Sequence, residues 1–173
     1  MPFEPYYKNL VNKFNDIGGY HELHPVHGPI DWPHNRRGVY AVWKKLGSEK
    51  KELIYVGKVG SYKNDNQMIV YGGGYFHSRA NRWTPYRFCE DNQNDNQYLY
   101  NFRYRPTYPP KQQGASRFNN DAYLFSIPYT EILIQCFIID ANHETYSPIL
   151  LESEILTNYL KYFNTLPPAN IEL

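Results

Sequence analysis

Glu152 is an acidic residue at an apolar position of an expected helix. Between residues 148 and 163 the apolar residues recur at helical spacing and form one stripe, made up of Ile149, Leu156, Tyr159, Leu160 and Phe163. Glu152 falls inside this stripe, whereas Glu154 falls on the opposite, polar face. A carboxylate buried among apolar groups needs a cation, a metal ion or a hydrogen-bond donor beside it. Glu152 therefore requires a partner, and this residue alone favours a structural salt bridge as much as a functional site.

Two tyrosines lie in short motifs, Gly-Val-Tyr ending at Tyr40 and Tyr-Val-Gly beginning at Tyr55. The segments 38–44 and 52–57 are rich in Val, Ile, Tyr and Trp and are joined by a polar turn, which predicts a β-hairpin. Cross-strand aromatic packing is the ordinary role of such residues in a chain with 18 tyrosines. A tyrosine can instead take a proton from an attacking water when cations lower its pKa from about 10.

Three arginines, Arg79, Arg82 and Arg87, are candidates for contacting an anion. The segment 75–83 predicts a short helix with an apolar face of Phe76, Ala80 and Trp83. Arg79 flanks this face and Arg82 points nearly away from it. Arg79 is therefore the better catalytic candidate and Arg82 a candidate for a backbone contact, and the choice between them stays open.

The segment from 96 to 120 contains no acidic residue, although the whole chain has a formal charge of only +1. Its basic residues alternate with tyrosines, phenylalanines and amides, and they are Arg103, Arg105, Lys111 and Arg117. Cations contact phosphates, amides read adenine edges, and aromatic rings stack on bases. The segment is a candidate DNA-reading insertion. Taken without further context, its composition is also natural for a long polar surface loop.

The elements that position these residues predict a small α/β (α+β) domain with a central antiparallel sheet flanked by helices. We expect a helix at 5–17, a Pro- and His-rich loop up to Arg37, and a polar loop at 60–74. A buried strand at 132–139 precedes the Glu152 helix. The 173 residues are expected to form one domain, with an N-terminal arm at 1–37 and an insertion at 87–128.

Other features of the chain point away from several classes of protein. The longest apolar stretch is too short to span a bilayer, and the first residues do not resemble a signal peptide, so a cytoplasmic protein without membrane association is expected. The two cysteines have no metal-binding spacing. His21, His24 and His27 recur at every third residue, which suits zinc, but Pro25 interrupts them and a plain loop is the favoured interpretation.

The order of these motifs resembles the GIY-YIG nuclease family. Gly-Val-Tyr, Tyr-Val-Gly, an arginine in the next helix, a strand, and Leu-Glu in a helix with an asparagine twelve residues later follow one another between about 38 and 164. Each tripeptide alone is common, whereas four elements in order are more specific. The arm and the insertion depart from the minimal family module. Such additions are similar to those of type II restriction endonucleases of this family.

The resemblance implies a role for each candidate. Tyr40 matches the general base, Tyr55 would orient water or phosphate, and the arginine would stabilise the charge of the transition state. Glu152 matches the ligand of one Mg²⁺ or Mn²⁺. Asn164 matches the closing asparagine, although its place near the helix end also suits an ordinary cap.

Two features around these matches stay open. The family often has histidine or tyrosine four residues after the arginine; Trp83 follows Arg79 at that distance, and Tyr86 follows Arg82. His77 and Lys58 are candidates for phosphate contact, or ordinary surface residues.

The function expected from the resemblance is a divalent-metal-dependent, sequence-specific double-stranded DNA endonuclease of the restriction type. Homing, repair and structure-specific nucleases of the same family are alternatives, as is a catalytically silent DNA-binding module or an interaction domain in which Glu152 is bound to Arg79. A palindromic target would require a homodimer or two sequential nicks. A companion methyltransferase is a further expectation of the restriction role, which the genomic neighbourhood would reveal.

Overall fold

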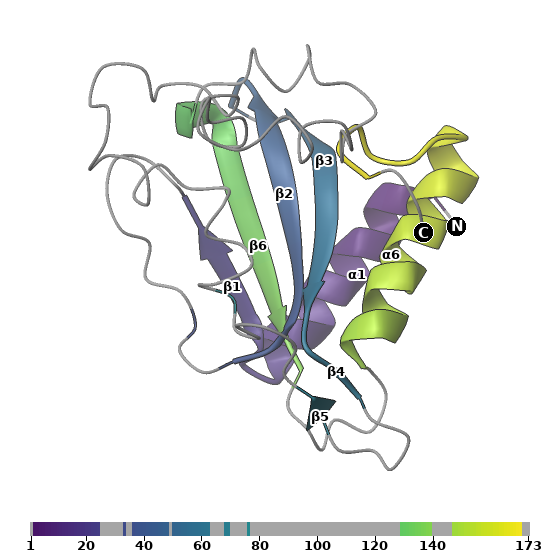
Figure 1. Ribbon diagram of the computed structural model, residues 1–173. Helices are drawn as coiled ribbons and strands as arrows, with labels where there is room; N and C mark the ends of the chain where they lie inside the picture. The colour runs from purple at the N-terminus through teal and green to yellow at the C-terminus, as the bar shows by residue number, and fades with distance from the viewer. Residues whose placement is uncertain are drawn as a thin grey trace, which may run out of the picture.

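The computed structural model describes residues 2–24, 33, 36–48, 50–62, 68–69, 76, 129–139 and 147–170. These residues form a four-stranded antiparallel sheet of order β1-β6-β2-β3 with two long helices on one face, an α+β arrangement (Figure 1). The elements are α1 (Phe3–Asp16), β1 (Tyr20–Leu23), β2 (Gly38–Leu46), β3 (Lys50–Val59), β4 (Ser61–Tyr62), β5 (Met68–Ile69), a 3-10 turn (Tyr129–Glu131), β6 (Ile132–Ile138) and α6 (Pro148–Phe163). In the described part of the chain, neither helix is long and apolar enough to cross a bilayer.

The helix α1 forms as its apolar spacing predicts. Phe3, Tyr7, Leu10 and Phe14 recur three or four residues apart and are all buried. Gly18 ends the helix with a left-handed φ of 68°, and its N–H donates to the carbonyl of Asn15. The predicted helix at 5–17 is thus confirmed, with bounds shifted by one or two residues.

The hairpin of β2 and β3 is also confirmed, and it is longer than predicted. Gly38 at the start of β2 has a φ of 146°, and a Cβ at this position would lie 1.8 Å from the carbonyl oxygen of Phe137 on β6. Only glycine allows β2 to approach β6 so closely. Near the middle of the hairpin the register shifts between Val42 and Trp43, so that Ile54 forms a β-bulge.

The strand β1 corrects the expectation of an uninterrupted loop between α1 and Arg37. Tyr20–Leu23 pairs antiparallel with β6 at one edge of the sheet. Two side-chain hydrogen bonds support it there: Tyr7 donates to Gln135 at 2.9 Å in a buried place, and Gln135 donates to Glu22 at 3.0 Å. Tyr20 also donates to Glu22, at 2.8 Å. The polar residue Gln135, which interrupts the apolar run of β6, is therefore fully used in joining α1, β6 and β1.

The helix α6 packs beside α1 on the same face of the sheet (Figure 1). Ser147 caps its first turn by accepting a hydrogen bond from the N–H of Leu150 at 3.2 Å, and Pro148 occupies the first turn. The predicted apolar stripe was partly wrong, because Ile149 and Phe163 are exposed. The buried residues are instead Pro148, Leu151, Ile155, Leu156 and Tyr159. Glu152 falls within this buried arc as well.

The chain after α6 covers the outer edge of β3. The N–H of Ala169 donates to the carbonyl of Ile54 at 2.8 Å. The side chain of Asn170 accepts from the N–H of Val56 and donates to its carbonyl, both at 2.9 Å. An amide side chain thus replaces a neighbouring strand at a sheet edge that would otherwise expose its backbone groups.

Within the predicted loop at 60–74, the short strands β4 and β5 pair with each other. The expected strand at 132–139 is confirmed as β6. Phe76 is helical, and the rest of the predicted helix at 75–83 lies outside the described residues.

Candidate active site

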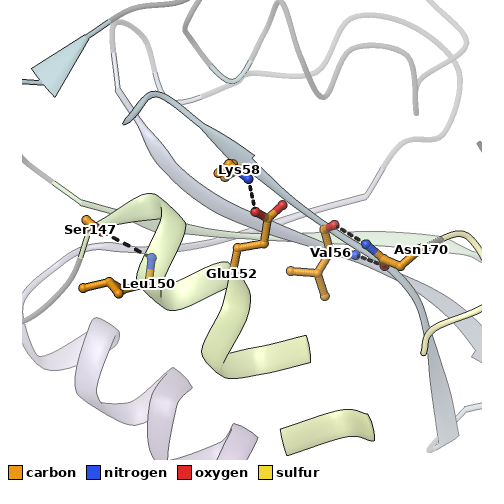
Figure 2. Close-up of polar contacts among 6 residues, drawn as sticks. All are labelled: Val56, Lys58, Ser147, Leu150, Glu152 and Asn170. Carbon is orange, nitrogen blue, oxygen red and sulfur yellow. Dashed lines mark hydrogen bonds and ion pairs between the residues drawn. The ribbon is translucent and has the colours of Figure 1, made fainter. Parts of the chain in front are cut away.

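The carboxylate of Glu152 forms an ion pair with Lys58 (Figure 2). Glu152 lies in the second turn of α6, and Lys58 is the last residue but one of β3, 94 residues away in sequence. The Glu152 side chain is 15% exposed and the Lys58 side chain 38% exposed. The predicted need of Glu152 for a partner is therefore met by a lysine.

Burial raises the pKa of Glu152 above its usual value, because it disfavours the charged form. The hydrogen bond and the positive charge of Lys58 act in the opposite direction but do not cancel the effect of burial. The carboxylate thus lies in a place that favours a positive charge beside it. A second cation or a metal ion there would stabilise the charged form further.

Tyr40 and Tyr55 lie together on neighbouring strands, with ring centroids 5.8 Å apart. Gly57 makes this packing possible: a Cβ at Gly57 would lie 2.6 Å from the Tyr55 ring and 2.8 Å from the Tyr40 hydroxyl oxygen. Tyr40 is almost fully buried at 2% exposure, and Tyr55 is half-buried. Both tyrosine rings therefore pack against Gly57, the glycine of the second motif.

The ring pair and the ion pair lie on opposite faces of the hairpin. Tyr40 is paired with Gly57, and Val39 is paired with Lys58. Because side chains alternate along a strand, Lys58 faces the helices together with Val39 and Val56, whereas the tyrosines face away from them. Both pairs nevertheless lie at the same end of the sheet, where β2 begins and β3 ends.

A further cation, Arg37, lies at this end of the sheet and was not singled out in the sequence. A Cβ built on Gly60 would lie 3.0 to 3.4 Å from the Arg37 side chain. The carbonyl of Arg37 accepts a hydrogen bond from the N–H of Ile139 at 2.9 Å, which fixes its backbone beside β6. Arg37 precedes the first motif directly, and only the pairing of β2 with β3 brings it against Gly60.

Asn164 lies at the other end of α6. Its backbone has a left-handed φ of 56°, and its N–H donates to the carbonyl of Leu160, so that it caps the helix. Twelve residues of helix separate it from Glu152, about 18 Å at 1.5 Å per residue. The structure therefore does not bring Asn164 to the ion pair, and the buried asparagine of the C-terminal segment is Asn170.

The remaining predicted site residues lie outside the described residues. They are Arg79, Arg82, His77, Arg103, Arg105, Lys111 and Arg117, together with the alternative Arg87 and the insertion at 87–128. Of the three histidines considered for zinc, His27 is also outside them. His21 lies in β1, and His24 lies 3.5 Å from the carboxylate of Glu22.

The donor chemistry at Glu152 suits one Mg²⁺ or Mn²⁺ bound through a single carboxylate. Among the residues that the structure describes, no three His, Cys, Asp or Glu side chains are grouped to hold a metal ion. Mg²⁺ commonly takes one or two protein carboxylates and completes its shell with water and substrate phosphates. A lone carboxylate that already attracts a cation is compatible with such a site, which would be completed by substrate.

Comparison of the chain with protein-family models, with curated proteins and with solved structures returns no match.

Proposed function

We propose that this protein is a divalent-metal-dependent DNA endonuclease that cleaves phosphodiester bonds at specific sequences, as restriction enzymes do. One observation carries the proposal: Glu152, largely buried and bound to a cation, lies at the same end of the sheet as the Tyr40–Tyr55 pair. The order of the motifs along the chain, which resembles the GIY-YIG nucleases, supports the same chemistry.

In this proposal the scissile phosphate binds past the end of β3, beyond Val59 and Gly60, because only there can it face both groups. Tyr40 takes a proton from the attacking water, and Tyr55 orients the water or a phosphate oxygen. Arg37 and the arginine of the predicted helix at 75–83 contact the phosphate oxygens. Glu152 holds the Mg²⁺ or Mn²⁺, which when bound supplies neutralisation of the charge on the leaving oxygen.

Recognition of a DNA sequence is assigned to the basic and aromatic insertion at 87–128. The four basic residues between 96 and 120 would contact phosphates, and the amides and aromatic rings of the insertion would contact bases. Cleavage of a palindrome would then require a homodimer with one copy on each strand, or two sequential nicks by one copy.

A second candidate function is a catalytically silent DNA-binding module. The ion pair itself favours it, because Lys58 satisfies Glu152 without any metal ion. In that case the carboxylate joins α6 to β3, and its removal weakens the fold. There is no cleavage for its removal to affect.

The first test is cleavage of unmethylated plasmid DNA by the wild type and by Glu152→Gln in the presence of Mg²⁺, with an EDTA control. We expect discrete fragments from the wild type, and a loss of at least about 10²-fold in rate for Glu152→Gln, because the metal ligand is removed. Glu154→Gln is the matched control, since it makes the same charge change two residues along α6, on the polar face, and is expected to cleave like the wild type.

The alternatives give different results. Salt-sensitive DNA binding without cleavage by any variant would support the silent module. Cleavage that is equal in Glu152→Gln and wild type would contradict the assigned role of Glu152. If the protein neither binds nor cleaves DNA, the proposal that it acts on DNA is wrong.

A further inference from the structure

We propose that Lys58 occupies the position of the divalent metal ion at Glu152, so that the ion binds only when Lys58 leaves the carboxylate. This inference rests on the proposed function, because it takes Glu152 as the metal ligand. It adds that metal binding at this site is regulated by DNA. DNA draws Lys58 away from Glu152, and the metal ion can then bind.

The first step of the argument is that the two cations exclude each other. The ammonium of Lys58 contacts Oε2 of Glu152, and only 15% of the Glu152 side chain is open to solvent. A divalent ion on either carboxylate oxygen would lie within a few ångströms of the ammonium. Two positive charges at that separation repel strongly where solvent is largely excluded. The metal ion and Lys58 therefore compete for Glu152.

The second step is that Lys58 is free to move. Its side chain is 38% exposed, more than twice the fraction of Glu152, and the ammonium is carried on a flexible aliphatic stem. Its cross-strand neighbour Val39 offers no second acceptor from its side chain. Lys58 can therefore turn from Glu152 to another anion without any change in the strands.

The third step is that a DNA phosphate is such an anion. A phosphate past the end of β3 lies one or two residues from Lys58 along the strand. Transfer of Lys58 to the phosphate leaves Glu152 without its cation, in a place where burial disfavours an unpaired charge. The metal ion then takes its place, so metal binding and DNA binding assist each other.

The test measures binding of Mn²⁺ to the DNA-free protein at pH 8, by calorimetry and by the electron paramagnetic resonance signal of free Mn²⁺. We expect Lys58→Met to bind Mn²⁺ about tenfold more tightly than wild type, because the competing charge is gone. Lys58→Arg keeps the charge and is expected to bind as weakly as wild type. Lys50→Met makes the same change at the far end of β3 and is expected to leave the affinity unchanged.

The outcomes separate this inference from the proposed function. If Glu152→Gln abolishes Mn²⁺ binding but Lys58→Met binds no more tightly than wild type, the competition is wrong and the metal site stands. If Mn²⁺ binding is the same in Glu152→Gln and wild type, the metal site itself is wrong, and the proposed function fails with it. Circular dichroism of each variant checks that the fold is intact, and Lys58→Arg supplies the comparison if Lys58→Met does not fold.

Discussion

Glu152 illustrates how far a single residue can be interpreted before a structure is known. Its position in an apolar stripe predicts burial and a partner, and both predictions are confirmed. The identity of that partner could not be predicted, because Lys58 is 94 residues away. The contact depends on the register of β3 and on the docking of α6, and neither is visible in the sequence around Glu152.

The raised pKa of Glu152 makes a prediction about stability and pH. Burial raises the folded-state pKa above the unfolded value, so the folded protein holds its proton to a higher pH than the unfolded chain does. The contribution of Glu152 to stability is therefore fully present below the unfolded pKa of about 4.3. It is lost as the pH rises through the raised folded pKa.

The measurement is the free energy of unfolding in urea, for wild type and Glu152→Gln, from pH 4 to pH 8. We expect the stability of Glu152→Gln relative to wild type to increase with pH over this range and then to level off. A difference that stays constant would show that Glu152 titrates in the folded protein as it does in the unfolded chain. A difference that decreases with pH would show that folding lowers the pKa of Glu152 instead of raising it.

The hairpin of β2 and β3 is the element that positions the site. Its existence follows from the two segments rich in Val, Ile, Tyr and Trp and from the polar turn between them, and it is confirmed. The roles of its glycines could not be predicted in the same way. Gly38 is required by the closeness of Phe137, and Gly57 by the two tyrosine rings, and both reasons appear only when the strands are paired.

Gly57→Ala tests the packing of the tyrosine pair. The added methyl group would lie 2.6 to 2.8 Å from the rings of Tyr55 and Tyr40, so at least one ring must move. We expect a loss of about 1–3 kcal/mol in the free energy of unfolding and a changed near-ultraviolet circular dichroism spectrum.

The control for this change is Gly18→Ala, where a methyl group meets nothing but the φ of 68° is unfavourable. It is expected to cost about 1–2 kcal/mol and to leave the aromatic spectrum as it is. An unaltered aromatic spectrum in Gly57→Ala would contradict the close packing of the two rings.

At the scale of the molecule, the sheet is held by contacts between distant parts of the chain. The α+β class, the hairpin and the two helices were predicted, because each depends on a local pattern. The strand β1 was not, because Tyr20–Leu23 is short and half polar, and its Glu22 accepts from Gln135 of the distant strand β6, which in turn accepts from Tyr7 of α1. The same holds for Asn170, whose partner Val56 is 114 residues away.

Asn170→Ala tests how strongly the C-terminal segment supports the sheet. The substitution leaves the N–H and the carbonyl of Val56 without their partners in a buried place. We expect a loss of about 2–4 kcal/mol in the free energy of unfolding by urea denaturation.

The matched control is Asn164→Gly, which changes an exposed asparagine in a left-handed conformation that glycine adopts readily. Its stability is expected to stay within about 0.5 kcal/mol of the wild type. Equal effects of the two substitutions would show that the edge of β3 does not depend on Asn170.

The bulge at Ile54 decides which face of the sheet carries which chemistry. On the turn side of the bulge Trp43 is paired with Leu53, and on the other side Val42 is paired with Tyr55. If β3 alternated regularly through Ile54 instead of forming the bulge, the residues after it would be out of phase by one, and Tyr55 would turn toward the helices while Lys58 turned away from them. The arrangement of the site is thus a matter of odd and even numbering, and one unpaired residue with no chemical role sets it.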